Sequence, residues 1–164
     1  MALADLLQWL EAQPFATAIS GSPWMFPVIE TVHVVAIALV VGSIAMLDLR
    51  LLGVARRSEG VIQLAEDVLP WTWASFAVAV VSGCLMFSSN ATKYFSIAPF
   101  RLKMVLLVLA GINMGVFHLT AYRSVHHWNH QIPTPVRARI AGGLSLFFWI
   151  CVVICGRRVG FVDL

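Results

Sequence analysis

The sequence predicts an all-α integral membrane protein, a four-helix bundle whose spans run up, down, up and down. Hydrophobic residues make up 60% of the 164 residues, and charged residues only 12%. A soluble fold of this size has too much surface to hide so much apolar material. The second observation is a set of four uncharged stretches, Thr31–Leu47, Val68–Thr92, Met104–Tyr122 and Ile140–Gly156. Each stretch fits the roughly 17–25 residues that a bilayer-spanning helix needs.

The chain begins with a predicted amphipathic helix at about residues 3–13, lying in the membrane interface. Four leucines recur there at helical spacing beside Trp9: Leu3, Leu6, Leu7 and Leu10. One apolar face on a short helix is typical of a helix that lies in the plane of the interface. We expect Pro14 to end this helix.

The four spans are predicted at residues 26–48, 68–90, 101–122 and 138–157, forming a single membrane domain over residues 1–164. The alternating order places the N-terminal segment, the loop near 90–100 and the C-terminal end on one side, called side A here. The loops near 49–67 and 123–139 lie on the other, side B.

Small residues predict where the helices pack closely. Gly111 and Gly115 form a small-xxx-small pair in the third span, and Gly142 and Gly143 begin the fourth. Such residues let helix backbones approach each other in a membrane. Asn113 is a further polar residue of the third span that we expect to face the bundle.

The basic residues do not favour a nucleic-acid partner, because they sit at helix ends and form no large cluster. Side A carries Lys93, Arg101, Lys103, Arg157 and Arg158, and side B carries Arg50, Arg56, Arg57, Arg123, Arg137 and Arg139. The N-terminal segment has no basic residue before the first span. We therefore expect a multi-pass protein of the cell (inner) membrane with its N-terminus outside the cytoplasm.

Glu30 and His33 stand out because ionisable groups in hydrocarbon are costly and usually have a function. They are three residues apart, so they lie on one face of the first span. One interpretation is a pair that satisfies itself or reaches back to side A. The other is a histidine that binds haem iron or a metal, or relays protons, with Glu30 fixing its tautomer.

Arg101 and Lys103 enter the third span from side A, at a depth near that of His33. They are candidates for membrane anchors or for cations that hold the propionates of a haem. His118 lies fifteen residues beyond Lys103, about 20 Å along the helix. One haem bound by both His33 and His118 is therefore geometrically awkward, and Met86 is another candidate second ligand.

Side B offers a different candidate site. His118 is followed by His126, His127 and His130, and His126 and His130 are one helical turn apart if the third helix continues past the membrane. That spacing suits copper or zinc, and methionines such as Met46, Met104 and Met114 are potential soft ligands. The alternative is a set of solvated loop histidines. On the same side, Asp48 and Arg50 are expected to anchor the end of the first span.

The segments "ETVHVVAIALVVGSIAMLDLRLLG" (Glu30–Gly53) and "FRLKMVLLVLAGINMGVFH" (Phe100–His118) resemble an uncharacterised family of bacterial four-helix membrane proteins. More distantly, the layout is similar to copper-resistance-D-like membrane domains and to membrane protoporphyrinogen oxidases that carry haem b. The positions that carry this resemblance are His33, Gly42, Lys103 and His118. The resemblance implies haem b as cofactor. The oxidases continue with a histidine-bearing aromatic segment where this chain has "LLG" after Arg50, which argues against protoporphyrinogen oxidation itself.

The leading hypothesis is a membrane haem b redox protein that exchanges electrons with quinol or a redox partner protein. As an enzyme it would be a haem-dependent membrane oxidoreductase. His33 would bind the iron, Glu30 would tune it, and Arg101 and Lys103 would hold the propionates. The alternatives are a copper-handling membrane protein that uses the side B histidines and a non-catalytic membrane subunit.

Overall fold

The computed structural model describes residues 3–130 and 133–161. Throughout these residues the regular elements are helices, with no strand, which confirms the all-α prediction. Four helices are long and apolar enough to cross a membrane. The protein is therefore a multi-pass membrane bundle in outline.

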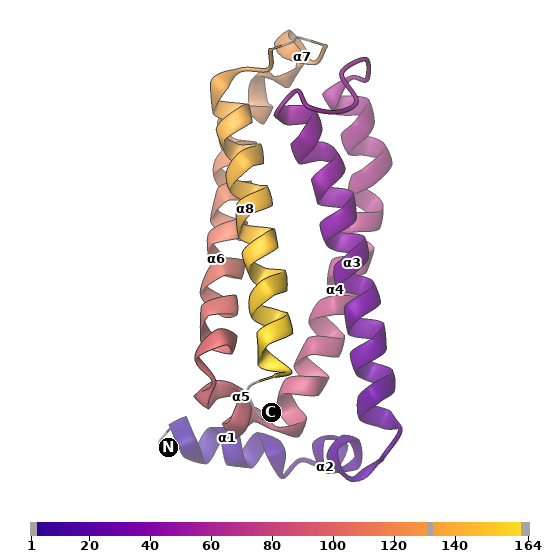
Figure 1. Ribbon diagram of the computed structural model, residues 1–164, viewed down its shortest axis with the longest axis vertical. Coiled ribbons are helices and arrows are strands. Elements are labelled where there is room, and N and C mark those ends of the chain that lie inside the picture. Colours follow the sequence, from indigo (N-terminus) through magenta and orange to yellow (C-terminus); the bar gives the residue numbers. More distant parts are fainter. Residues whose placement is uncertain (1–2, 131–132, 162–164) are drawn as a thin grey trace.

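The bundle consists of two helix pairs. α3 (Met25–Leu51) packs along α4 (Val61–Ser89), and α6 (Ala98–Leu119) packs along α8 (Val136–Val159) (Figure 1). The two pairs meet mainly where α3 contacts α8. Any site between the pairs is therefore built from α3 and α4 on one side and from α6 and α8 on the other.

The side A end carries more helices than the sequence predicts. α1 (Leu3–Glu11) is followed by a second short helix, α2 (Pro14–Gly21), and α5 (Ala91–Ser96) precedes α6. Pro14 does separate two helices, but it also begins the second one, because a proline fits the first helical turn where no hydrogen-bond donor is needed. The Glu11 carboxylate then accepts a 2.7 Å hydrogen bond from the backbone N–H of Thr92, which joins α1 to α5. All three helices lie across the lower end of the bundle in Figure 1.

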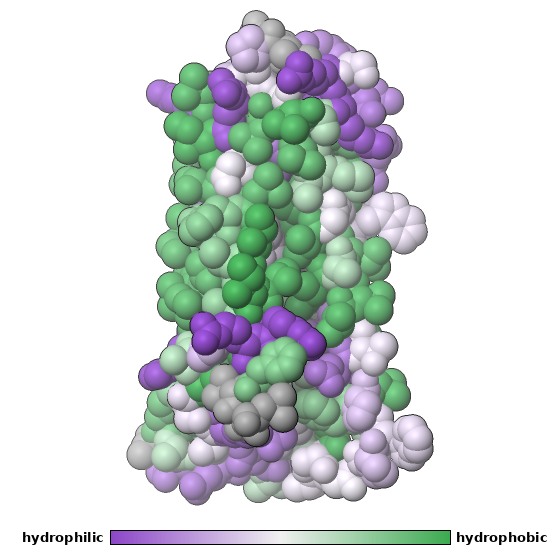
Figure 2. Space-filling model, viewed as in Figure 1, coloured by the Kyte–Doolittle hydropathy of each residue, from purple (hydrophilic) through white to green (hydrophobic). Residues whose placement is uncertain are grey.

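The surface has the polarity of a membrane protein. Figure 2 shows hydrophobic residues over the middle of one face and hydrophilic residues gathered towards both ends. Large apolar side chains point outwards along every long helix; Leu39, Val81, Val108 and Ile150, for example, are each more than half exposed. In water such a surface would be unfavourable, whereas lipid chains solvate it.

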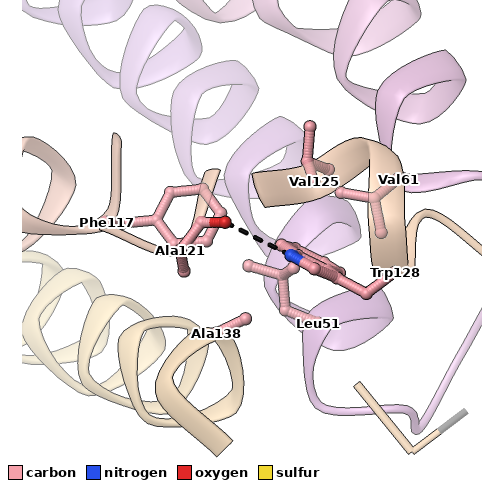
Figure 3. Packing of buried hydrophobic residues seen from close by; sticks show 7 residues of the cluster. All are labelled: Leu51, Val61, Phe117, Ala121, Val125, Trp128 and Ala138. Atoms are coloured by element: carbon pink, nitrogen blue, oxygen red, sulfur yellow. Dashed lines mark hydrogen bonds between the residues drawn. The ribbon is translucent and has the colours of Figure 1, made fainter. Parts of the chain in front are cut away.

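A compact core closes the side B end. Trp128 of α7 (Val125–Trp128) is 4% exposed, and its indole N–H donates to the Ala121 carbonyl at 3.2 Å (Figure 3). The other residues of this cluster are Leu51, Val61, Phe117, Val125 and Ala138. They come from α3, α4, α6, α7 and α8, so this core ties the two helix pairs together.

The close helix crossings differ in part from those predicted. A Cβ atom at Gly142 would lie 3.1 Å from the Asp48 carbonyl oxygen and from Leu51 Cβ, so this glycine does permit α8 to cross α3 closely. A Cβ at Gly111 or Gly115 would meet nothing within 4 Å. The prediction that this pair packs helices together is wrong within one chain, because both glycines face away from the neighbouring helices.

Candidate functional site

His33 lies inside the bundle, on the α3 face that packs against α4. It is eight residues into α3, about 12 Å along the helix axis, and is partly buried. Its Nδ1 atom is 3.0 Å from the Ser82 hydroxyl oxygen of α4. The sequence prediction of a functional histidine in the side A half of the membrane therefore falls on a side chain with a defined polar partner.

The Ser82 hydroxyl indicates which nitrogen of His33 carries the proton. Ser82 Oγ lies 2.6 Å from the Val78 carbonyl, to which its single proton is donated. The oxygen is then an acceptor towards His33, so Nδ1 carries the hydrogen that is donated to Ser82. In the neutral imidazole this leaves Nε2 with a free lone pair, the state that binds a metal.

Gly83 makes room for the ring. A Cβ atom at this position would lie 3.0 Å from His33 Cε1 and 3.5 Å from Nδ1. Few real Cβ contacts are so short, so any side chain here would push the imidazole away from α4. Ser82 and Gly83 together form the seat of the ring, and sequence reasoning missed both. Two adjacent small residues in an apolar span are common, so they did not indicate a contact with a histidine ring.

Lys103 approaches the same layer from the other helix pair. Its ammonium nitrogen lies 3.8 Å from where a Cβ at Gly156 would stand, so the side chain runs along α8. The Lys103 charge is near enough to the His33 imidazole to act on it electrostatically. Within the described residues no carboxylate pairs with Lys103. Lys103 is thus a partly buried cation that has no counterion in residues 3–130 and 133–161.

Glu30 and Arg101 are placed differently from these two. Both side chains are exposed, and neither has a hydrogen bond or ion pair among the described residues. Glu30 lies one turn before His33, but the polar partner of the imidazole is Ser82. The structure therefore brings His33 and Lys103 into one layer and leaves Glu30 and Arg101 at its rim.

His118 does not join this layer. It is exposed near the end of α6, its Nδ1 lies 2.9 Å from the Met114 carbonyl of its own helix, and its ring packs 5.2 Å from that of Tyr122. Fifteen residues separate it from Lys103, about 22 Å of helix. Met86 is nearer, because it is one turn from Ser82 on α4 and is partly buried.

The side B histidines are dispersed. His126, His127 and His130 are all exposed, and α7 ends at Trp128, so His130 lies beyond the helix that would align it with His126. Among residues 3–130 and 133–161, no group of three or more His, Cys, Asp or Glu side chains could hold a metal ion.

Arg50, expected only as an anchor, holds the side B loops together. It is 0% exposed. Its Nε donates to the Glu59 carbonyl at 2.7 Å, and its Nη2 donates to the Asn129 carbonyl at 3.2 Å. Asn129 also accepts hydrogen bonds from the backbone N–H groups of Val61 (3.1 Å) and Ile62 (2.8 Å), which satisfies the free N-terminus of α4. This network holds together the side B end of the bundle, about 25 Å of helix away from His33.

A ligand beside His33 and Lys103 would meet an imidazole whose Nδ1 is held by Ser82 and an ammonium that has no ion pair among the described residues. Gly83 stands next to His33, and Gly156 stands next to Lys103. An imidazole for the iron and a cation for a carboxylate are groups with which proteins hold a haem, and His33 and Lys103 are of these two types. They bring one axial ligand, and His118 is not placed to supply the second.

The comparisons with known proteins give a family but no activity. No curated protein and no solved structure matches the chain. A model described as "Family of unknown function (DUF6644)" matches residues 23–162, which include all four long helices up to the end of α8 and leave out α1 and α2. With most of its length matched, the chain belongs to this family of unknown function, DUF6644.

Proposed function

We propose that the protein is a membrane redox protein that binds haem b between its two helix pairs, in the layer of His33 and Lys103. The observation that carries the proposal is the His33 imidazole, whose Nδ1 lies 3.0 Å from Ser82 Oγ and whose Nε2 has no hydrogen-bond partner among the described residues. A histidine buried in hydrocarbon with a defined tautomer is suited to an axial ligand.

Each residue of the layer has a role in this proposal. His33 holds the iron through Nε2, and Ser82 orients the ring and keeps the proton on Nδ1. Lys103 binds a propionate and thereby gains the counterion that it lacks among the described residues. Gly83 and Gly156 provide the room that the His33 ring and the Lys103 side chain themselves occupy. Haem b, when bound, supplies a one-electron iron couple inside the membrane.

The partners and the orientation follow from the same proposal. The donor or acceptor is a quinol or quinone in the bilayer, or a redox protein at one surface. We place the protein in the cell (inner) membrane with side A outside the cytoplasm, because no basic residue precedes the first span and side B has six of the eleven Lys and Arg residues. Alkaline phosphatase fused to the C-terminal end would then be active. An inactive phosphatase fusion, together with a fluorescent fusion of a reporter that folds only in the cytoplasm, would indicate the opposite orientation.

The deciding experiment is an absorption spectrum of the detergent-purified protein in oxidised and dithionite-reduced states, with pyridine haemochrome quantitation. We expect about one b-type haem per chain. His33→Ala should lose the haem while its circular dichroism stays helical. His118→Ala is the matched control, since this exposed histidine bonds only to its own helix, and it should keep the haem.

Two results would reject the proposal. One is a colourless protein purified from haem-replete cells. The other is equal haem retention in the His33→Ala variant and the wild type. Metal analysis of the same samples would test the copper hypothesis, because stoichiometric copper without haem would move attention to the side B histidines.

A further inference from the structure

Asp48 is a buried acidic residue at the contact that joins the two helix pairs. It lies three residues before the end of α3 and is 5% exposed. A Cβ atom at Gly142 of α8 would lie 3.1 Å from the Asp48 carbonyl oxygen, so the two helix backbones approach closely at this level. Leu51, one turn further along α3, packs with Ala138 of α8 in the side B core (Figure 3). Asp48 is therefore enclosed where α3 crosses α8.

The carboxyl group of Asp48 has few polar neighbours. The Ser145 hydroxyl of α8 is the hydrogen-bonding group that faces it. The Oδ2 atom is buried and has no hydrogen-bond partner among the described residues, so the bond with Ser145 falls on Oδ1. A carboxylate that stays ionised inside a protein accepts several hydrogen bonds or pairs with a cation. One hydroxyl is much less than such a group needs.

No cation within the described residues compensates Asp48, which forms no ion pair there. Arg50, two residues later, directs its guanidinium to the Glu59 and Asn129 carbonyls. α2, which also contacts α3, has no charged residue. The charged residues and histidines at the side B ends of the neighbouring helices are all exposed: Glu66 and Asp67 on α4, His118 on α6, Arg123 just after it, His126 and His127 on α7, and Arg137 and Arg139 on α8.

These surroundings favour the protonated acid over the carboxylate. An unpaired carboxylate in a low-dielectric interior is unfavourable, and such a group is neutralised instead. The nearer source of the proton is side B. Asp48 is about 4.5 Å of helix from the side B end of α3 and about 35 Å from its side A end.

We propose that Asp48 is a proton-binding site of this membrane protein, protonated while the two helix pairs are in contact and exchanging its proton with water on side B. When the proton leaves to water, an ionised carboxylate remains at the contact, with Ser145 as its donor. The contact between α3 and α8 is then weaker, so proton binding stabilises the joined bundle. The site lies about 22 Å of helix from His33 and goes beyond the proposed function, because it needs no bound haem.

Infrared spectroscopy of the purified full chain in detergent measures the protonation directly, because a protonated carboxyl group has a C=O stretching band that a carboxylate lacks. We expect this band in the wild type at neutral pH and its loss in Asp48→Asn. Asp67→Asn is the matched control: Asp67 is exposed on α4, so this variant should keep the band. Ser145→Ala should move the band to higher frequency, because the carbonyl loses its hydrogen-bond donor.

Three spectroscopic results would overturn the proposal. The first is a wild type without the band at neutral pH, and the second is a band of equal size in Asp48→Asn. The third is loss of the band when sodium is added at constant pH, which would indicate a metal-cation site in place of a proton site.

The effect of the proton on the helix contact is measured by unfolding in sodium dodecyl sulfate at about pH 5 and about pH 9. The folded protein holds the Asp48 proton more tightly than the unfolded chain does, so the free energy of unfolding should fall as the pH rises. Asp48→Asn, which resembles the neutral acid, should lose part of this fall, whereas Asp67→Asn should keep it. An equal fall in the wild type and in Asp48→Asn would show that this proton does not hold the helix pairs together.

Discussion

Nδ1 of His33 and Oγ of Ser82 are 3.0 Å apart, and this contact joins α3 to α4 in the side A half of the membrane. The Ser82 hydroxyl donates its own hydrogen bond to the Val78 carbonyl, at 2.6 Å. The pair therefore does two things at once: it links two spans, and it leaves Nε2 of the imidazole free. Helix–helix hydrogen bonds in membranes contribute little stability on average, so the second consequence is the more informative one.

Ser82→Ala should weaken haem binding about 10-fold or more while leaving the bundle folded. Groups that orient a ligating histidine typically change metal affinity by about 10- to 100-fold. The measurement is a titration of apo-protein with haem. Ser88→Ala is the control because its hydroxyl bonds only to the Leu85 carbonyl of α4. Equal affinities for the two variants would show that Ser82 does not orient the ligand.

Lys103→Met should lower both haem retention and the reduction potential of the haem, whereas Arg101→Met should change neither. Lys103 is partly buried in the His33 layer, and Arg101 is exposed. Removing the cation leaves a propionate charge uncompensated, which disfavours the extra electron of the ferrous state. A redox titration followed at the reduced haem band measures the potential. Equal shifts in the two variants would place the propionates elsewhere.

Arg50→Lys should destabilise the protein by about 2 kcal/mol, because a single ammonium cannot replace both hydrogen bonds of the guanidinium. These bonds run to the carbonyls of Glu59 and Asn129 at 2.7 and 3.2 Å. The free energy of unfolding is measured by titration with sodium dodecyl sulfate. Arg56→Lys is the control, since its ion pair with Glu59 is exposed and such pairs contribute about 0–1 kcal/mol. Matching losses in the two variants would contradict a special role for Arg50.

Asn113→Leu should cost little, about 0.6 kcal/mol and at most about 1.7 kcal/mol. Its side-chain amide donates to the Ala141 carbonyl across the α6–α8 contact at 2.9 Å. The carbonyl also accepts within its own helix, so losing Asn113 leaves it satisfied. The same unfolding titration measures the effect, and a loss comparable to that of Arg50→Lys would indicate that Asn113 organises a larger polar network.

Composition and hydropathy were sufficient to predict most of the fold. Four long apolar stretches are enough to predict four spanning helices, because the bilayer demands their length and leaves only helices to satisfy the backbone. The ends of the helices were harder to place. α4 begins at Val61, earlier than its apolar stretch, because Asn129 from another part of the chain caps it. The sequence around Val61 does not predict this cap, because Asn129 is 67 residues away in the chain.

Only some residues of the candidate site were predicted from the sequence. Glu30 and His33 were conspicuous because ionisable groups in hydrocarbon are rare, and Lys103 was a candidate because it enters the third span at a similar depth. Ser82 and Gly83 were not conspicuous, since small residues are common in membrane helices and their meaning depends on what packs against them. The same holds for the glycines: Gly142 crosses α3 closely, whereas Gly111 and Gly115 face away from the neighbouring helices.

By itself the sequence determined that this protein lies in a lipid bilayer, how many spans it has and which ionisable residues interrupt them, because each of these follows from hydrophobicity along the chain. The tertiary structure alone decided that His33 meets Ser82, that Lys103 finds no carboxylate among the described residues, and that Arg50 is fully buried between loops. These relationships depend on the rotation of each helix about its own axis. That rotation is set by how facing side chains fit together, and a span that is apolar on every side does not encode it.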